Sequence, residues 1–461
     1  MKKEQMLLLI LLVFSLSLFS LTEASIPDNY SEENAGSEEN PYKISNLANL
    51  RWLSETQEVW GTEEQTFYFI QTADIDASET QNWNNNEGFS PIGINHYNIE
   101  TDEFLTIPFY GVYNGDDYHI ENLFITPVLE SNISKNGALF GYAKNGDIRN
   151  LNLQNAYVKA QTSAILIAQA INIMVKNCFT SGIVTSNTGL AGNVGGLIGY
   201  ASSVQVDMCY SEATVTMLSE TSSAGGLVGM LVNQSIIVNS YFMGSLFGYG
   251  YLAKLGGIAG GCYNSSIDKC YVTSSEIFST ASGIVGFVMD SLIMSCFWDT
   301  ETTGTNNAYN DSLNSVITAT GLSSAEMKNI QNYINSGWDF ESIWSISPDI
   351  NRGYPHFNSI TSITDDMIVD LQKDSIVYPN PVNGGDVNFK TSIADKDTEI
   401  SIYNIKGQLV KTSKAFQEKD NESVFTWNKK NNQNQSVASG VYFYKIKTDD
   451  KVKTGKFLIM K

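Results

Sequence analysis

A short glycine-rich word recurs along the middle of the chain and limits the folds open to it. Its clearest form, Gly-Gly-apolar-apolar-Gly, occupies residues 195–199 and 225–229. The copies begin at residues 137, 163, 195, 225, 256 and 282, which are 26 to 32 residues apart. The copy at 163 reads SAILI and lacks the glycines, yet it falls where the period requires it. A period of this length indicates a stack of equivalent units, none of which buries a hydrophobic face alone.

A second word, apolar-x-x-Cys/Ser-aromatic, follows each glycine word and keeps the same period. Stacked coils would place equivalent residues about 4.8 Å apart in columns, and the purely apolar column must then face inward. The glycines are expected at corners where neighbouring coils crowd. The apolar column is Ile148, Val175, Val206, Ile237, Ile267 and Ile293; the fourth position of the word is Cys178, Cys209, Cys270 and Cys296, with Ser240 and Leu151 in equivalent places; the glycines are Gly141, Gly195, Gly199, Gly225, Gly229, Gly256, Gly260 and Gly286.

The cysteines have a structural explanation in this arrangement. Four of the five share the inward column, and Cys262 lies in a glycine-rich corner. Exchange with Ser240 and Leu151 favours small, buried, free thiols. The spacing of neighbouring coils also permits a disulfide such as Cys178–Cys209, and metal binding is a third alternative.

The ends of the chain differ from the repeats. Lys2 and Lys3, an apolar run from Leu7 to Leu21 and small residues before Ser25 predict a signal peptide over 1–24. A membrane anchor is the alternative, but the run is short of the roughly 20 residues that a span needs. Acidic residues dominate up to residue 372 and lysines dominate beyond it. An acidic body argues against nucleic-acid binding, because neutralising phosphates takes clustered Lys or Arg.

The sequence therefore divides into segments with distinct expectations. Residues 25–40 are polar and acidic and are expected to be a flexible lead-in. Residues 41–136 are expected to form an N-terminal capping region with a helix where Leu47, Leu50 and Leu53 recur. The solenoid repeats are expected over 137–300, and a C-terminal cap with a helix begun by Ser323 or Ser324 over 301–358. Residues 359–374 read as a linker and 375–461 as a separate domain.

The repeats resemble the GLUG-motif repeats of bacterial surface proteins, whose name describes the word at 196–199 and 226–229. The flanking words PYKISN (41–46), DIDAS (74–78), FSPIG (89–93) and FWDTETTG (297–304), and the tail of 337–355, add to the likeness. The resemblance covers roughly 41–358 and implies a parallel β-helix. It implies no assigned activity, and surface adhesion is the usual suggestion for the family.

Residues 375–461 resemble the type A sorting domain of the type IX secretion system. The matching words are VYPNPV (377–382), ISIYNIKGQLVKT (400–412), SGVYFYKIKT (439–448) and KTGKFLIMK (453–461), with motif residues Pro379, Asn380, Pro381, Gly407, Gly440 and Lys461. Their alternating pattern predicts a small immunoglobulin-like antiparallel β-sandwich. The resemblance implies export by the type IX machinery, removal of the domain, often attachment to lipopolysaccharide, and a Gram-negative host of the Bacteroidota type. The fold class expected overall is all-β, a capped parallel β-helix followed by this sandwich.

No catalytic set stands out, so the sequence predicts a non-enzyme without a cofactor. His96, His119 and His356 lie in separate segments. Asp207 and Asp268 share a column two coils apart, near 10 Å, which invites comparison with the carboxylate pair of a glycosidase. They are more simply solvent-facing strand positions. Asp74 with Asp76, or Asp116 with Asp117, offers oxygen ligands for Ca²⁺, although capping of turns is the simpler role.

The aromatic residues that follow the Cys column are the stronger lead for binding. Phe179, Tyr210, Tyr241 and Tyr271 either form an exposed ladder that stacks on sugar rings or peptides, or an internal stack at a coil corner. The leading hypothesis is an exported, non-catalytic solenoid that binds a surface glycan or a host or matrix protein. The alternatives are a polysaccharide-degrading β-helix enzyme and a structural surface spacer.

Overall fold

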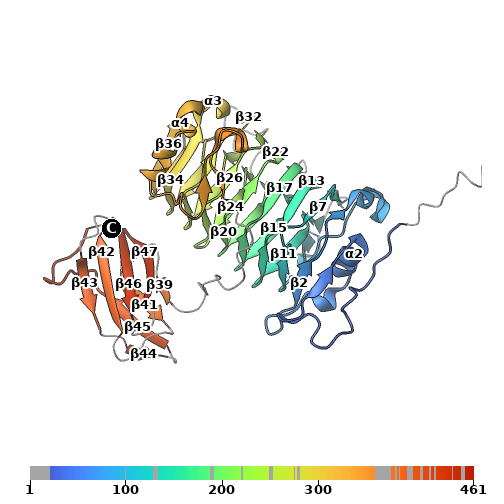
Figure 1. Ribbon diagram of the computed structural model, residues 1–461, viewed down its shortest axis with the longest axis horizontal. Helices are drawn as coiled ribbons and strands as arrows, with labels where there is room; N and C mark the ends of the chain where they lie inside the picture. Colours follow the sequence, from blue (N-terminus) through green and yellow to red (C-terminus); the bar gives the residue numbers. More distant parts are fainter. Residues whose placement is uncertain are drawn as a thin grey trace, which may run out of the picture. The chain divides into compact units, whose positions relative to one another are not determined.

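The protein is seen here in a computed structural model (Figure 1). It describes residues 21–358, except 99, 128–132, 187–191, 220–221, 249–252, 275 and 278–280. In the tail it describes 375–378, 382–383, 385–391, 398–404, 409–414, 417–419, 422–438, 440–447 and 452–460. Most of the expected leader, the linker 359–374, and Pro379, Asn380, Pro381, Gly407 and Lys461 lie outside the described residues. The chain forms two compact units, which divide after Asn358.

The first unit is a parallel β-solenoid of about eight turns, which confirms the predicted fold class. Its largest sheet has 21 strands, and every pairing in it is parallel. The strands are β1 (Tyr42–Ile44), β2 (Tyr68–Gln71), β3 (Ile75–Asp76), β6 (Val112–Asn114), β7 (His119–Glu121), β8 (Phe124–Ile125), β12 (Asp147–Arg149), β13 (Asn152–Ala160), β16 (Met174–Lys176), β17 (Phe179–Ser186), β20 (Gln205–Asp207), β21 (Tyr210–Ser211), β22 (Thr214–Met217), β25 (Ile236–Val238), β26 (Tyr241–Phe242), β27 (Ser245–Gly248), β30 (Ser266–Asp268), β31 (Tyr271–Val272), β32 (Glu276–Ile277), β34 (Leu292–Asp299) and β36 (Val316–Leu322).

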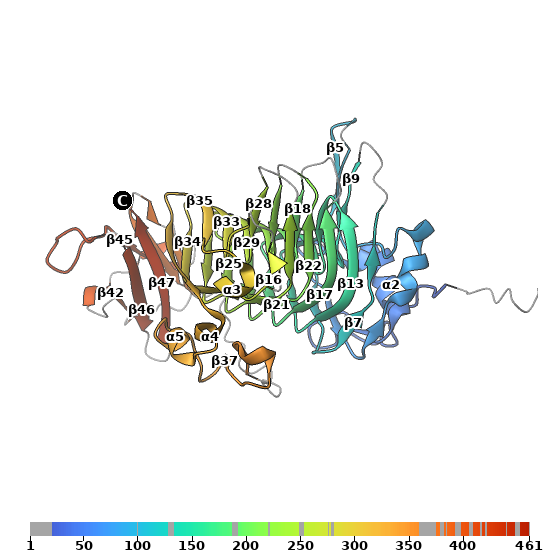
Figure 2. The ribbon, with the colours of Figure 1, turned by 90° about the horizontal axis from the view of Figure 1, so that it is seen from above.

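Two further parallel sheets complete the wall of the solenoid (Figure 2). One contains β10 (Asn136–Gly137), β14 (Thr162–Ala164), β18 (Asn193–Gly195), β23 (Ser223–Gly225) and β28 (Lys254–Gly256). The other contains β11 (Phe140–Lys144), β15 (Ile167–Ile171), β19 (Ile198–Ser202), β24 (Val228–Val232), β29 (Ala259–Tyr263), β33 (Val285–Met289) and β35 (Tyr309–Leu313). Each glycine word thus lies at the passage from one of these sheets to the other.

The inner columns hold the solenoid together. Val206 pairs with Val175 on one side and with Ile237 on the other, and Ile237 pairs with Ile267. All six members of this apolar column are at most 1% exposed, and they belong to one continuous core cluster. Burying aliphatic side chains in every layer supplies the main stabilising free energy, because a single coil buries too little.

The repeat glycines are needed for close backbone approach, not for left-handed conformations. A Cβ atom on Gly195 would lie 1.9 Å from the carbonyl oxygen of Ile198, and one on Gly229 would lie 2.5 Å from the carbonyl oxygen of Gly199 in the preceding coil. The left-handed corner positions belong chiefly to asparagines. In two ladders, Asn172 Nδ2 donates to Asn145 Oδ1 at 2.9 Å, and Asn177 Nδ2 donates to Asn150 Oδ1 at 3.0 Å. Asparagine tolerates this conformation and bonds locally.

The solenoid is longer than the sequence analysis predicted. Of the strands in the expected N-terminal cap, β1, β2, β3, β6, β7 and β8 belong to the same large sheet, and β35 and β36 add a final layer beyond residue 300. That last layer has mostly exposed side chains, since nothing in the described part of the chain stacks on it. A layer covered on one side needs fewer apolar residues, which explains why no repeat word marks it.

Short helices lie at the ends and along the side of the solenoid. They are α2 (Leu47–Glu55), α3 (Thr300–Thr303), α4 (Ser324–Met327) and α5 (Ile330–Ile334), with 3-10 turns η1 (Gln57–Val59), η2 (Ser78–Asn82), η3 (Asn84–Asn86) and η4 (Asn351–Gly353). The helix predicted from Leu47, Leu50 and Leu53 is α2, which buries all three in the core at the N-terminal end of the stack (Figure 2). The helix predicted after Ser323 is two helices, of which α4 begins with a capping box between Ser323 and Glu326.

The segment expected to be a flexible lead-in, residues 25–40, instead forms turns fixed by a buried asparagine. Asn29 Nδ2 donates to Asn40 Oδ1 at 3.0 Å and to the Pro41 carbonyl at 2.9 Å, while its Oδ1 accepts from the Lys43 amide. Tyr30 also stacks on Tyr42, with ring centroids 5.5 Å apart. A polar composition did not prevent order here because the polar groups bond to one another.

Three short antiparallel strands and one hairpin complete the first unit. These are β4 (Ile94–Asn98), β5 (Glu103–Ile107) and β9 (Ile133–Ser134), and the pair β37 (Trp344–Ser345) and β38 (His356–Phe357).

The second unit contains two small sheets around one core. The first sheet contains β39 (Ser375–Tyr378), β41 (Val387–Thr391), β44 (Gln417–Lys419) and β45 (Glu422–Trp427); the second contains β40 (Val382–Asn383), β42 (Glu399–Asn404), β43 (Leu409–Ser413), β46 (Gly440–Lys447) and β47 (Val452–Met460). All pairings are antiparallel except β40 with β47. Phe389 and Trp427 of the first sheet pack with Tyr442 and Phe457 of the second. This is the small sandwich that the alternating pattern predicted.

Candidate functional site

The aromatic column forms a continuous stack on the outer side of the coil wall. Ring centroids lie 4.4 Å apart for Phe179 and Tyr210, 4.7 Å for Tyr210 and Tyr241, and 4.8 Å for Tyr241 and Tyr271. Tyr241 and Tyr271 pack in a cluster separate from the solenoid core. The rings of the ladder therefore point outward from the coil, as the first of the two alternatives predicted.

The ladder is nevertheless covered by the C-terminal segment 323–358. Trp344 is fully buried, with its ring 6.1 Å from Tyr241, 6.0 Å from Tyr271 and 4.8 Å from Phe357. Figure 2 shows α4, α5 and β37 along one side of the solenoid. The segment expected to close the open end thus packs on a side, because the apolar aromatic surface lies there. Of the four ladder residues, Tyr241 and Tyr271 are buried, and only Phe179 and Tyr210 are still partly exposed.

Hydrogen bonds fix this cover to the wall. The hydroxyl of Tyr271 donates to the Pro355 carbonyl at 2.6 Å, and Trp338 Nε1 donates to the Ser295 carbonyl at 2.9 Å. Asp299, which is buried, accepts from the hydroxyl of Tyr354 at 2.6 Å and from that of Ser324 at 2.7 Å. A ladder held in this way is a structural joint, and its buried part offers no surface to a ligand.

The carboxylates weighed as a catalytic pair do not converge on open solvent. Val238 lies between Asp207 and Asp268 in the column. Asp268 is only 5% exposed. Asp207 Oδ1 accepts from Asn239 Nδ2 at 3.0 Å, and burial raises the pKa of the Asp207 carboxyl. Asp268 is buried and Asp207 is half-buried with one oxygen already bonded, so the two do not form the open pair of carboxylates that such hydrolysis uses.

Four of the cysteines form a buried hydrogen-bonding column. All five are free and buried. The sulfur of Cys209 accepts from the Cys178 amide at 3.4 Å and donates to the Asp207 carbonyl at 3.3 Å. Ser240 makes the same two kinds of contact, accepting from the Cys209 amide at 3.1 Å and donating to the Val238 carbonyl at 2.8 Å. Burial raises the pKa of Cys209 well above its ordinary value, so the thiolate that would react is suppressed.

The carboxylates weighed as Ca²⁺ ligands take part in turn and corner contacts. Asp76 Oδ1 accepts from the Ser78 amide at 2.9 Å and from Asn122 Nδ2 at 3.1 Å. Asp74 Oδ1 lies 2.9 Å from His119 Nδ1. Asp116 and Asp117 both have left-handed backbones. Among the described residues no group of three His, Cys, Asp or Glu side chains is placed to hold a metal ion.

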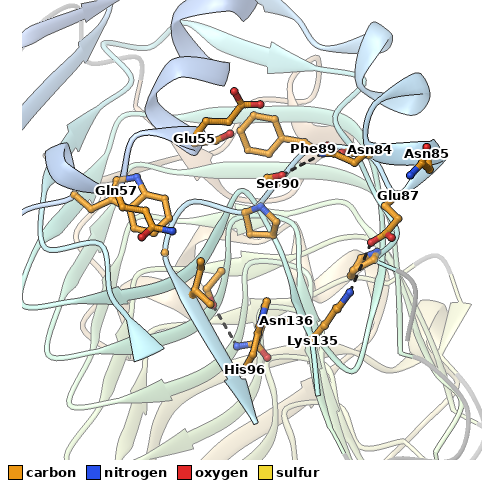
Figure 3. A pocket seen from close by; sticks show the side chains of 18 residues that line it. Glu55, Gln57, Asn84, Asn85, Glu87, Phe89, Ser90, His96, Lys135 and Asn136 are labelled. Carbon is orange, nitrogen blue, oxygen red and sulfur yellow. Dashed lines mark hydrogen bonds and ion pairs between the residues drawn. The ribbon is translucent and has the colours of Figure 1, made fainter. Parts of the chain in front are cut away.

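A pocket of about 520 Å³ opens in the N-terminal region, where the sequence analysis named no site (Figure 3). Its residues come from the end of α2, from η3 and the loop that follows it, from strand β4, from residues just before the first glycine word, and from the last glycine of that word, Gly141. Half-buried Pro91, Ile94 and Pro127 form an apolar floor, and Trp60 and Phe89 are buried beside them. Polar side chains surround it: Glu55, Gln57, Asn84, Asn85, Glu87, Ser90, His96, Lys135 and Asn136.

The charges around this pocket are compensated in pairs. Arg51 Nε lies 2.7 Å from Glu55 Oε1, and Lys135 Nζ lies 3.9 Å from Glu87 Oε2. Burial, together with the positive charge of Lys135, lowers the pKa of His96. His96 is therefore neutral near pH 7, and it is the one of the three histidines that lines this pocket.

The loop on one side of the pocket has an unusual backbone. Asn84, Asn85 and Asn86 are successive left-handed residues, with φ of 50°, 56° and 67°. Asn84 Nδ2 fixes the loop by donating to the Gly88 carbonyl at 2.7 Å and to Ser90 Oγ at 3.1 Å (Figure 3). Three non-glycine residues in this conformation cost free energy, and such strain concentrates at functional sites. The run of three asparagines was the sequence signal that could have pointed to the pocket.

Comparison with known proteins gives the tail a family. Residues 376–460 match the secretion system C-terminal sorting domain. The type IX secretion machinery handles proteins with this tail, so the chain is a secreted or cell-surface protein with a β-solenoid body. None of the helices in the described part of the chain is long and apolar enough to cross a bilayer.

Two curated relatives match about a third of this chain. Halomucin of Haloquadratum walsbyi is 36% identical over 171 residues, which are 36% of this chain and 2% of halomucin. An immunoglobulin A1 protease of Streptococcus pneumoniae is 30% identical over 148 residues, 31% of this chain and 8% of the protease. A cell-surface-expressed chitinase from a Paenibacillus species is similar at 11% identity and a TM-score of 0.15, over 75% of this chain and 24% of the chitinase. The chain thus spans a small part of each.

Proposed function

We propose that the chain is a non-catalytic, surface-displayed or secreted β-solenoid that binds a glycan or a host or matrix protein. The observation that carries the proposal is the charge-compensated pocket on the body of a chain that ends in a sorting domain. A pocket of this size suits recognition of a small part of a larger ligand. The rigid stack would hold that pocket at a fixed distance from the cell.

The proposal also covers the class of the repeats, the signal peptide, the host and the surface anchor. We assign the repeats to the GLUG-motif class on their words at 196–199 and 226–229. We also assign 1–24 to a signal peptide, the host to the Gram-negative Bacteroidota, and the surface anchor to lipopolysaccharide. The signal peptide follows from Lys2, Lys3 and the apolar run that ends at Leu21, whereas the host and the anchor follow from the likeness of the tail to a type IX sorting domain.

The test compares binding with catalysis and with a spacer role. The purified full chain is applied to a glycan array and to plates coated with cells or matrix proteins. We expect saturable retention without any shortening of the glycans. A spacer would score nothing on every surface, and an enzyme would release shorter products, so either result contradicts the proposal.

A further inference from the structure

We propose that the pocket between α2, η3 and Lys135 binds the end of a neutral saccharide. This inference rests on the proposed extracellular binding role and names the ligand class for it. The apolar floor of the pocket and the amide side chains at its rim indicate a sugar. The paired charges around the pocket indicate that this sugar is neutral.

The floor suits the C–H face of a sugar ring. The surface of the floor comes from Pro91, Ile94 and Pro127, which are half-buried, whereas Trp60 and Phe89 are only 1% and 2% exposed and serve as buried support. The floor therefore contributes apolar surface with no unsatisfied donor. Aliphatic surface of this kind packs against the apolar side of a pyranose, while the hydroxyls point to the rim.

The amides of the rim suit hydroxyl groups. Asn85 and Gln57 are exposed and make no side-chain hydrogen bond within the described part of the chain. Each amide offers both donors and an acceptor, which matches a hydroxyl that also does both. The bonded Asn84 holds the loop, so Asn85 is positioned before any ligand arrives and binding costs less ordering.

The charges select against ionised ligands. Glu55 is paired with Arg51 and Glu87 with Lys135. A sulfate, phosphate or uronate would lose hydration in the pocket and would face two carboxylates whose partners are already engaged. A saccharide without charge loses only hydroxyl hydration, which the amides replace.

The experiment uses the full chain and a panel of neutral oligosaccharides, each with a sulfated or uronate counterpart, in titrations followed by saturation-transfer NMR. Asn85→Ala and Gln57→Ala should weaken binding of the best neutral ligand by about tenfold each, since each removes hydrogen bonds that the ligand then lacks. Asn82→Ala is the matched control, because Asn82 is exposed in the neighbouring turn and does not line the pocket. We expect the control to bind as the unaltered chain does.

Other outcomes overturn the inference and separate it from the proposed function. Saccharide binding that all variants retain would place the ligand elsewhere and leave the binding role standing. Preference for the charged counterparts would contradict the charge argument. Retention on cells or matrix without binding of any saccharide would also refute the pocket's assignment while the wider role survives. Failure on every surface would refute both.

Discussion

At the level of single residues, glycine, asparagine and cysteine each have a different structural role in the coils. Glycine permits the contact between layers, asparagine turns the chain, and cysteine or serine satisfies backbone groups beside the core. The inward direction of Ile237 follows from alternation, which a repeat makes readable in the sequence. The asparagine corners were not predicted, because Asn145 and Asn172 look like ordinary loop residues until their left-handed backbones are known.

Two adjacent isoleucines test the inward assignment. Ile237 is fully buried, whereas Ile236 is 40% exposed on the same strand β25. Ile237→Asp places a charge among stacked aliphatic side chains and should lower the free energy of unfolding by several kcal/mol. Ile236→Asp should change it by about 0.5 kcal/mol or less. Urea unfolding measures both, and equal effects would contradict the register.

His96 makes stability depend on pH. Its pKa in the folded chain is lowered by burial and by Lys135, which is itself paired with Glu87. The folded state therefore takes up a proton less readily than the unfolded state, so this contribution to stability is lost as pH falls below about 6.5. His96→Gln should lose less thermal stability than the unaltered chain between about pH 7.5 and about pH 5. If the melting temperatures of the two proteins fall by the same amount across that pH range, His96 does not contribute to the pH dependence.

At the level of elements, the repeats made the strands of the solenoid predictable. The position of the covering segment 323–358 could not be predicted in the same way. Each coil repeats local patterns, so β20, β25 and β30 could be expected from the words alone. The position of 323–358 depends on packing against residues far away in the chain, such as Tyr241 and Tyr271. The pocket escaped prediction for the same reason, since its walls come from three separated segments.

A substitution at Trp344 tests whether the covering segment 323–358 can detach without unfolding the solenoid. Its indole is fully buried between the ladder and Trp338, and its Nε1 has no hydrogen-bond partner in the described residues. Trp344→Ala should therefore cost about 3–5 kcal/mol of docking through packing alone. Hydrogen exchange should rise in 323–358 and in β26 and β31, with the inner columns unaffected. Ile350→Ala, at a 49% exposed position of the same segment, should change nothing. Exchange that rises throughout the solenoid would show that the cover is no separate unit.

At the level of the whole molecule, the two units differ in architecture and in charge. The body is an acidic parallel stack, while the tail is a lysine-rich sandwich that matches the sorting family over 376–460. The sequence made this division visible because each unit repeats or alternates in its own way. Net charge of one sign on the body favours solubility outside the cell. Delivery and binding are thus assigned to separate parts of one chain.

The mass of the surface protein tests this division most directly. Protein recovered from the outside of the native host should end near residue 375, and a chain without 375–461 should stay inside the cell. Intact-mass measurement and C-terminal peptide mapping of both fractions decide the matter. Peptides from β47 found on surface-exposed protein, or full display of the shortened chain, would contradict the account.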